Sequence, residues 1–219
     1  MTTQIARGIK AVRLDGDDSL LLAESAGWDA VAETSVALQP TPLEAQPSAY
    51  VRKTWERRPY GQIATVGVKA AVAGGALHIR LRWLAPEPRH AITDNDVFAD
   101  ACGVLFPLNG KDAELSTMGD EARPVEAWHW RAGTMEPFVL TAAGLGTTSR
   151  TAAHGVTVSA AWDKSQWSVA FRRALDAPGA PLSAGTSVPM GIAVWRGSLS
   201  ERAGIKSHTP DWIALELAD

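Results

Sequence analysis

The sequence predicts a mainly β protein, an antiparallel β-sandwich of two sheets with a few short helices. Short segments in which apolar and polar residues alternate recur along the 219 residues, and glycines or polar turns separate them. The 13 prolines argue against long helices, because proline removes a backbone donor and clashes with the preceding turn. All-β domains often reach this length undivided, so we expect residues 1–219 to form a single domain.

The first predicted hairpin pairs residues 63–72 with residues 77–83 across Gly74 and Gly75. In its second arm, Leu77, Ile79, Leu81 and Trp83 alternate with polar residues. Because successive side chains of a strand point to opposite faces, this arm should have one buried face. The glycine pair supplies the positive φ values that a tight hairpin turn requires.

A second predicted hairpin joins residues 156–160 to residues 167–171 through a polar turn at 163–166. Trp167, Val169 and Phe171 alternate with polar or small residues in its second arm. Further short strands are expected at 104–108, 125–130, 138–142, 188–195 and 212–217. Strands at such frequent intervals are typical of a sandwich or barrel.

Residues 1–60 show little alternation and contain Pro40, Pro42 and Pro47. We expect them to form an irregular N-terminal arm or a partner-facing segment. No stretch approaches the roughly 18 apolar residues that a membrane-spanning helix needs, so no membrane span is expected. The amino terminus also shows no long apolar segment that would indicate a signal peptide.

Composition excludes several classes of function. A single cysteine, Cys102, cannot form an internal disulfide or a Cys-x-x-Cys-His site for covalent c-type haem. The net charge of −3 gives no basis for nucleic-acid binding, which usually needs a basic surface. No Ser-His-Asp, Cys-His or paired-carboxylate arrangement stands out, so an autonomous hydrolase is unsupported.

Nine tryptophans dominate the aromatic content, against six tyrosines and phenylalanines together. Most should fill the core, because tryptophan buries a large area and needs only one hydrogen-bond partner. Two other interpretations are a lining for a flat prosthetic group and a stacking platform for sugars. The second would make the chain a carbohydrate-binding β-sandwich module.

Met118 and Lys206 are the candidate metal ligands, each in a loop beside an aromatic-rich strand. The thioether of methionine is a soft axial ligand in cytochromes, and Gly119 after Met118 permits a close backbone approach. On spacing alone, a loop methionine that packs locally and a solvated lysine are the simpler interpretations. Lysine ligates iron only after losing its proton, and His208 is a rival ligand because imidazole is the commoner haem partner.

The surroundings of both residues resemble the haem-binding gamma subunit of the ethylbenzene dehydrogenase family, which belongs to the type II dimethyl sulfoxide reductase-like molybdenum enzymes. The matching positions around the methionine are Met118, Gly119, Pro124, Val125, Trp128 and Trp130. Those around the lysine are Ala193, Val194, Trp195, Gly197, Glu201, Arg202, Gly204, Lys206 and Ser207. The resemblance covers most of residues 60–217 and fades over the first 50 or so residues.

The resemblance implies a b-type haem, held non-covalently between an axial methionine and an axial lysine at one end of the sandwich. Carried over by position, Met118 and Lys206 become the metal ligands. The other implied cofactor-binding residues are Gly119, Trp128, Trp130 and Trp195.

The same resemblance implies an electron-transfer subunit that is not itself an enzyme. Its partners would be an alpha subunit with a molybdenum centre, a beta subunit with iron–sulfur clusters, and an external acceptor such as a cytochrome c. The implied location is the periplasm, with the cytoplasm as the alternative. Besides the carbohydrate-binding module, a haem-free structural subunit of the same fold stays open.

Overall fold

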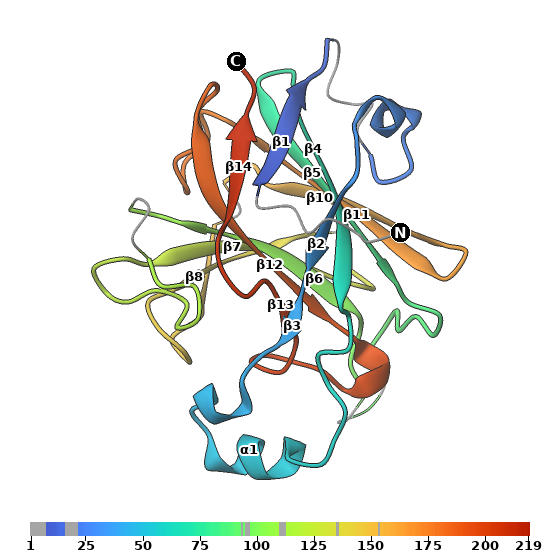
Figure 1. The fold of residues 1–219 in the computed structure, drawn as a ribbon, viewed down its shortest axis with the longest axis vertical. Helices are drawn as coiled ribbons and strands as arrows, with labels where there is room; N and C mark the ends of the chain where they lie inside the picture. Colours follow the sequence, from blue (N-terminus) through green and yellow to red (C-terminus); the bar gives the residue numbers. More distant parts are fainter. Residues whose placement is uncertain are drawn as a thin grey trace.

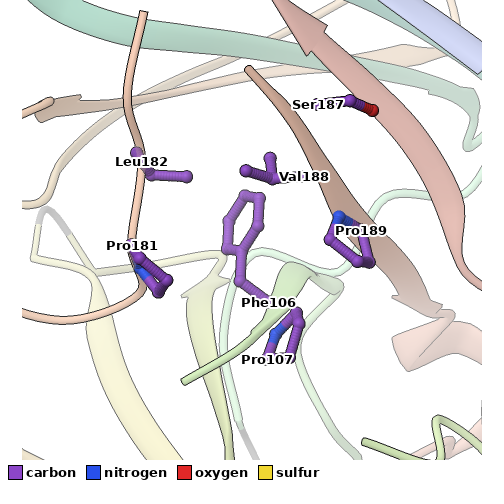
Figure 2. Close-up of a pocket in the computed structure, with 7 residues that line it drawn as sticks. All are labelled: Phe106, Pro107, Pro181, Leu182, Ser187, Val188 and Pro189. Carbon is purple, nitrogen blue, oxygen red and sulfur yellow. The ribbon is translucent and has the colours of Figure 1, made fainter. Parts of the chain in front are cut away.

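The computed structural model describes residues 8–15, 22–92, 94, 97–109, 113–134, 136–152 and 154–219. These residues form two β-sheets that face one another, and the short helix α1 (Ala49–Trp55) lies at the lower end of the view in Figure 1. Short 3-10 segments are η2 (Ala26–Ala30), η3 (Leu43–Ala45) and η4 (Gly197–Leu199). The predicted mainly β sandwich with few helices is confirmed. No helix in the described part of the chain is long and apolar enough to cross a membrane.

The two sheets share strand β12 (Ser187–Trp195), whose first half pairs with one sheet and whose second half pairs with the other. In spatial order, the first sheet contains β10 (Thr157–Asp163), β11 (Gln166–Ala174), β5 (Ala76–Leu84), β4 (Thr65–Ala73), β1 (Gly8–Arg13) and β14 (Ile213–Leu217), with β2 (Thr34–Ala37) also on β4. Beyond β12, the second sheet contains β6 (Ala101–Pro107), β7 (Val125–Arg131), β8 (Phe138–Ala142) and β9 (Ser149–Thr151). Strand β13 (Ser207–His208) pairs with β12, and β3 (Gln39–Pro40) pairs with β13.

Both predicted hairpins are confirmed. In the first, Gly74 and Gly75 have φ values of 55° and 72° and connect β4 to β5. In the second, Lys164 and Ser165 adopt the same left-handed region, with φ values of 48° and 64°, between β10 and β11. Two-residue turns with positive φ at both positions match the right-handed twist of paired strands, which fixes the register of each hairpin.

In the segment 1–60, expected to be an irregular N-terminal arm or a partner-facing segment, the described residues include strands β1, β2 and β3, helix α1 and segments η2 and η3; residues 1–7 and 16–21 lie outside the described part. Strand β1 lies between β14 and β4 and runs parallel to both, so the sheet is mixed and not wholly antiparallel. Only Ile9 and Ala11 of β1 are buried. Two apolar residues are too few to give a recognisable alternating pattern.

The inner faces of the two sheets enclose the main core. Trp83 and Trp167 of the first sheet meet Trp130 of the second, with ring centroids 6.3 Å and 4.9 Å from it. Cys102 is buried on the same inner face. Six of the nine tryptophans are less than 10% exposed, as the core-filling interpretation predicts. The buried ones are Trp28, Trp55, Trp83, Trp128, Trp130 and Trp167.

Candidate functional site

The outer face of the second sheet carries a second apolar cluster, separate from the main core. Its residues come from β6, β7, β8 and β12, from the loop between β6 and β7, and from the segment before β14, and we call it the outer-face cluster. The buried members are Leu105, Leu115, Ala127 and Ala193, and the partly buried members are Met118, Leu140, Trp195 and Trp212. Two of the residues predicted as site residues, Met118 and Trp195, therefore lie in one cluster.

Strand register places a row of residues across this face. Ala193 pairs with Gly103, Gly103 pairs with His129, and His129 pairs with Phe138. Directly paired residues point to the same side of a sheet, so all four belong to the outer face. Small residues occupy the β12 end of the row, and two rings stand at its β8 end.

His129 joins the aromatic groups of this face. Its ring centroid lies 5.0 Å from that of Trp195 and 5.9 Å from that of Phe138. Burial lowers the pKa of His129 to about 4, and the positive charges of nearby arginines and of Lys206 contribute to the lower pKa. The imidazole is therefore neutral at pH 7, and its buried Nδ1 has no hydrogen-bond partner.

Lys206 lies directly before β13, where Thr41 fixes its backbone. The carbonyl of Lys206 accepts hydrogen bonds from the amide of Thr41 at 3.0 Å and from its hydroxyl at 3.2 Å. Its Nζ is 5.3 Å from the ring centroid of Trp195. No acceptor in the described part of the chain pairs with this half-buried amine. Burial lowers the pKa of Lys206 to about 8, which brings loss of its proton close to neutral pH.

His208, the rival ligand in the sequence, lies close to Lys206. It pairs with Ala193 across β13 and β12, and so it points to the outer face. Burial and the charge of Lys206 lower the pKa of His208, and its Nε2 has no hydrogen-bond partner. Two imidazoles and one amine with free donor atoms therefore gather on this face.

Met118 occupies a tight turn in the loop between β6 and β7. Its amide donates to the carbonyl of Leu115 at 3.0 Å, and that of Gly119 donates to the carbonyl of Glu114 at 2.8 Å. Met118 and Gly119 have φ values of 59° and 76°. A left-handed conformation costs a side-chain-bearing residue roughly 1–2 kcal/mol. Such strain is found most often where a side chain has a functional task.

Trp128 and Trp130 are separated from the other predicted site residues. Both point into the main core, on the face of β7 opposite His129. The indole of Trp128 donates to Oε1 of Glu126 at 2.8 Å, and Trp130 packs on Trp167. Their expected place beside the cofactor is therefore not supported, because strand alternation sends them inward.

His129 and Phe138 lie on the outer face instead. Sequence reasoning did not assign His129 to the site. The alternation in β7 was the signal that could have found it.

The chain matches the family model described as ethylbenzene dehydrogenase over residues 25–164, which is more than half of its length. That span includes Met118 and ends before Lys206. The gamma subunit of chlorate reductase from Ideonella dechloratans is 34% identical over 71% of this chain and 69% of its own length. A protein of Haloferax mediterranei, named for a respiratory nitrate reductase heme subunit, is 28% identical over 94% of this chain and 72% of its own length.

A third relative is the dimethylsulfide dehydrogenase gamma subunit of Rhodovulum sulfidophilum. It is 28% identical over 67% of this chain and 58% of its own length. The names of the first and third relatives describe gamma subunits, and the name of the second describes a heme subunit.

Similar solved structures support the fold alone. A family 9 carbohydrate-binding module of Caldicellulosiruptor kristjanssonii, in complex with cellotriose, has a TM-score of 0.50 at 11% identity and covers 95% of this chain and 93% of its own. A protein of Bacteroides uniformis, described as carbohydrate-binding, has a TM-score of 0.53 at 6% identity over 96% and 98% of the two chains. The β-sandwich fold is thus shared with sugar-binding proteins, whereas the family of this chain is established by sequence similarity. The chain belongs to the ethylbenzene dehydrogenase family.

Proposed function

We propose that this chain is an electron-transfer subunit that holds one b-type haem non-covalently on the outer face of the second sheet. The observation that carries the proposal is the state of Lys206. Its amine is half-buried over Trp195, lacks an acceptor among the described residues, and has a pKa lowered to about 8. An unpaired buried amine is costly in a folded protein unless it has a partner from outside the chain.

The donor set suits haem iron. Met118 offers a thioether from the outer-face cluster, and Lys206 offers an amine beside Trp195, a residue of the same cluster. Methionine is an established axial ligand that raises the potential of a cytochrome. When bound between these two residues, the haem supplies a one-electron iron couple.

The protein residues have distinct tasks in this arrangement. Burial of the Lys206 side chain disfavours its charged form, and the hydrogen bonds to Thr41 fix its backbone. The proton leaves the Lys206 amine for solvent as the amine becomes a ligand. Gly119 allows the turn that presents Met118, and Cys102 faces the core, so no thiol is available for covalent attachment.

The proposed partners are inferred from the names of the relatives. They are named as gamma or heme subunits of chlorate reductase, nitrate reductase and dimethylsulfide dehydrogenase. We infer a complex with a molybdenum-containing alpha subunit and an iron–sulfur beta subunit, located in the periplasm. Electrons would pass between the iron–sulfur subunit and an external acceptor such as a cytochrome c. Residues 1–219 would act as one haem-binding domain.

Sugar binding is less well supported, although the fold is shared with sugar-binding proteins. A stacking platform needs exposed aromatic rings. Among tryptophans in the described residues, only Trp162 is more than a third exposed, at 37%. Its indole also donates to the carbonyl of Ala85 at 2.9 Å.

The test is reconstitution of the purified chain with haem, followed by absorbance spectra of the oxidised and dithionite-reduced forms. The expected result is stoichiometric binding, with a Soret band and sharp low-spin α and β bands after reduction. A folded chain that gives no Soret band after haem titration would contradict the proposal and favour a haem-free structural subunit. Calorimetric titration with cello-oligosaccharides on the same sample would show heat only if the sugar-binding alternative holds.

A further inference from the structure

Two arginines flank Phe138 at the β8–β9 side of the outer face. The guanidinium carbon of Arg150 lies 3.9 Å from the ring centroid of Phe138, and that of Arg131 lies 5.4 Å from it. Arg150 pairs with Leu140 across β9 and β8, and therefore points to the same face as the outer-face cluster. Both guanidinium groups therefore contact the same aromatic ring.

Neither cation has a carboxylate partner in the described part of the chain. Other arginines do have one: Arg173 pairs with Glu126 at 3.4 Å, and Arg82 pairs with Glu33 at 3.2 Å. Both Arg131 and Arg150 are close enough to His129 to lower its pKa, which independently places their charges next to the cluster. Their hydrogen-bond donors are therefore available to an anion bound on this face.

A continuous series of ring contacts connects these cations to Lys206. The amine of Lys206 lies over Trp195, Trp195 is next to His129, and His129 is next to Phe138. The outer face therefore has an amine at one end of an aromatic row and two guanidinium groups at the other. A flat, largely apolar ligand that carries anionic groups at one edge fits this pattern.

We propose that Arg131 and Arg150 bind the two propionate groups of the haem. This inference rests on the proposed function and adds the residues that orient the cofactor. Guanidinium groups bind carboxylates through two parallel hydrogen bonds, and stacking on Phe138 would keep both forks in place. The cations would thus determine which edge of the haem faces β8 and β9.

The test compares haem with haem dimethyl ester, in which both carboxylates are neutral. Each is titrated into the full chain, and the dissociation constant is taken from the Soret band. We expect wild-type protein to bind haem about 10- to 100-fold more tightly than the ester, from the usual strength of hydrogen bonds to charged groups. Added salt should reduce the preference, since it screens exposed charges.

The variant Arg131→Gln/Arg150→Gln should lose this preference, while an Arg131→Lys/Arg150→Lys protein should retain part of it. Arg82→Gln is the matched control, because it removes one guanidinium from β5 in the first sheet. Circular dichroism verifies that each variant is folded.

Three results would count against the inference in different ways. Equal wild-type affinity for haem and its ester would overturn it and leave the proposed function intact. A preference that survives in the folded glutamine variant would do the same. A chain that binds neither compound would overturn both proposals.

Discussion

The carboxylate of Asp100 is buried and the amine of Lys206 is half-buried, but only the carboxylate has hydrogen-bond partners among the described residues. Asp100 is 2% exposed and accepts from Trp167 Nε1 at 2.8 Å, from the amide of Arg89 at 2.9 Å and from the amide of Gly197 at 2.7 Å. The Lys206 Nζ lies over the face of Trp195 and has no hydrogen-bond or ion-pair acceptor among the described residues. One group stabilises the fold, whereas the other costs stability.

The difference teaches how to separate structural from functional polar groups here. Buried polar groups are hydrogen-bonded in the great majority of cases, so unpaired ones need a reason. His129 and His208 share the condition of Lys206, and all three lie on the outer face of the second sheet. Two of the buried side-chain nitrogens without a hydrogen-bond partner among the described residues therefore lie on this face, while others, such as Trp83 Nε1, lie elsewhere.

The largest effect is expected for Asp100, the group whose hydrogen bonds are satisfied. Asp100→Ala would leave three buried N–H donors without an acceptor, so we expect a loss of roughly 3–5 kcal/mol in the free energy of unfolding. Urea denaturation of the haem-free chain measures it. Asp176→Ala, at an exposed position, is the control and should change stability little. Equal stability of wild type and Asp100→Ala would refute the structural role of this carboxylate.

Lys206→Leu should change the free energy of unfolding in the opposite direction. The folded-state pKa of about 8 lies below the usual value of 10.5, so the fold disfavours the charged amine. Removing that amine should stabilise the haem-free chain by up to about 3 kcal/mol at pH 7. The measurement is the same urea denaturation.

The pH dependence supplies the control for Lys206→Leu. As pH rises from about 8 to 10.5, wild-type Lys206 becomes neutral in the folded state first, so the wild type gains stability relative to the variant. The difference between the two proteins should therefore shrink across this window. A variant less stable than wild type at pH 7 would show that the amine has a stabilising partner.

His129→Phe should change the response to acid. The folded-state pKa of about 4 lies below the ordinary 6.5, so wild-type stability is complete above pH 6.5 and falls as pH decreases toward 4. Between pH 7 and pH 5 this group should account for a loss of about 2 kcal/mol in the haem-free chain. The variant should lack that component when thermal or urea unfolding is compared at the two pH values. An identical acid response in both proteins would contradict the burial of a neutral imidazole.

Gly119→Ala should have the smallest effect. Its φ of 76° and the closeness of an added Cβ to the Arg123 carbonyl oxygen disfavour any side chain there. We expect a loss of about 1–2 kcal/mol in stability together with weaker haem binding, because the turn that presents Met118 must shift. Gly146→Ala is the matched control, since its φ of 83° is similar but nothing lies within contact of its added Cβ. If both variants weakened haem binding equally, the turn at Met118 would not be the cause of the weaker binding.

Much of the fold could be predicted from the sequence because alternation is a local signal. The two hairpins and the strands β6, β7, β8, β12 and β14 fall within a few residues of the predicted ranges. Strand β1 could not be predicted, since its parallel pairing with β4 and β14 depends on partners about 60 and 200 residues away. Its two buried residues carry no such long-range information.

The candidate site, like the fold, could be predicted from the sequence only in part. Met118, Lys206 and Trp195 came from the resemblance to a family, and the structure brings Met118 and Trp195 into one cluster with Lys206 against it. Trp128 and Trp130 lie in the main core, on the face of β7 opposite His129, because alternate residues of a strand face opposite ways. Arg150 was not found, because only the pairing of β9 with β8 places it on this face.

The most direct test of the central claim is the ligand set of the reconstituted haem. Ferric and ferrous absorbance, with electron paramagnetic resonance of the ferric form, should be compared among wild type, Met118→Leu, Lys206→Leu, His129→Phe and His208→Ala. We predict a six-coordinate low-spin haem in the wild type and in both histidine variants, and its loss or conversion to high spin in the methionine and lysine variants. A low-spin spectrum that survives Lys206→Leu and disappears in His208→Ala or His129→Phe would contradict the account.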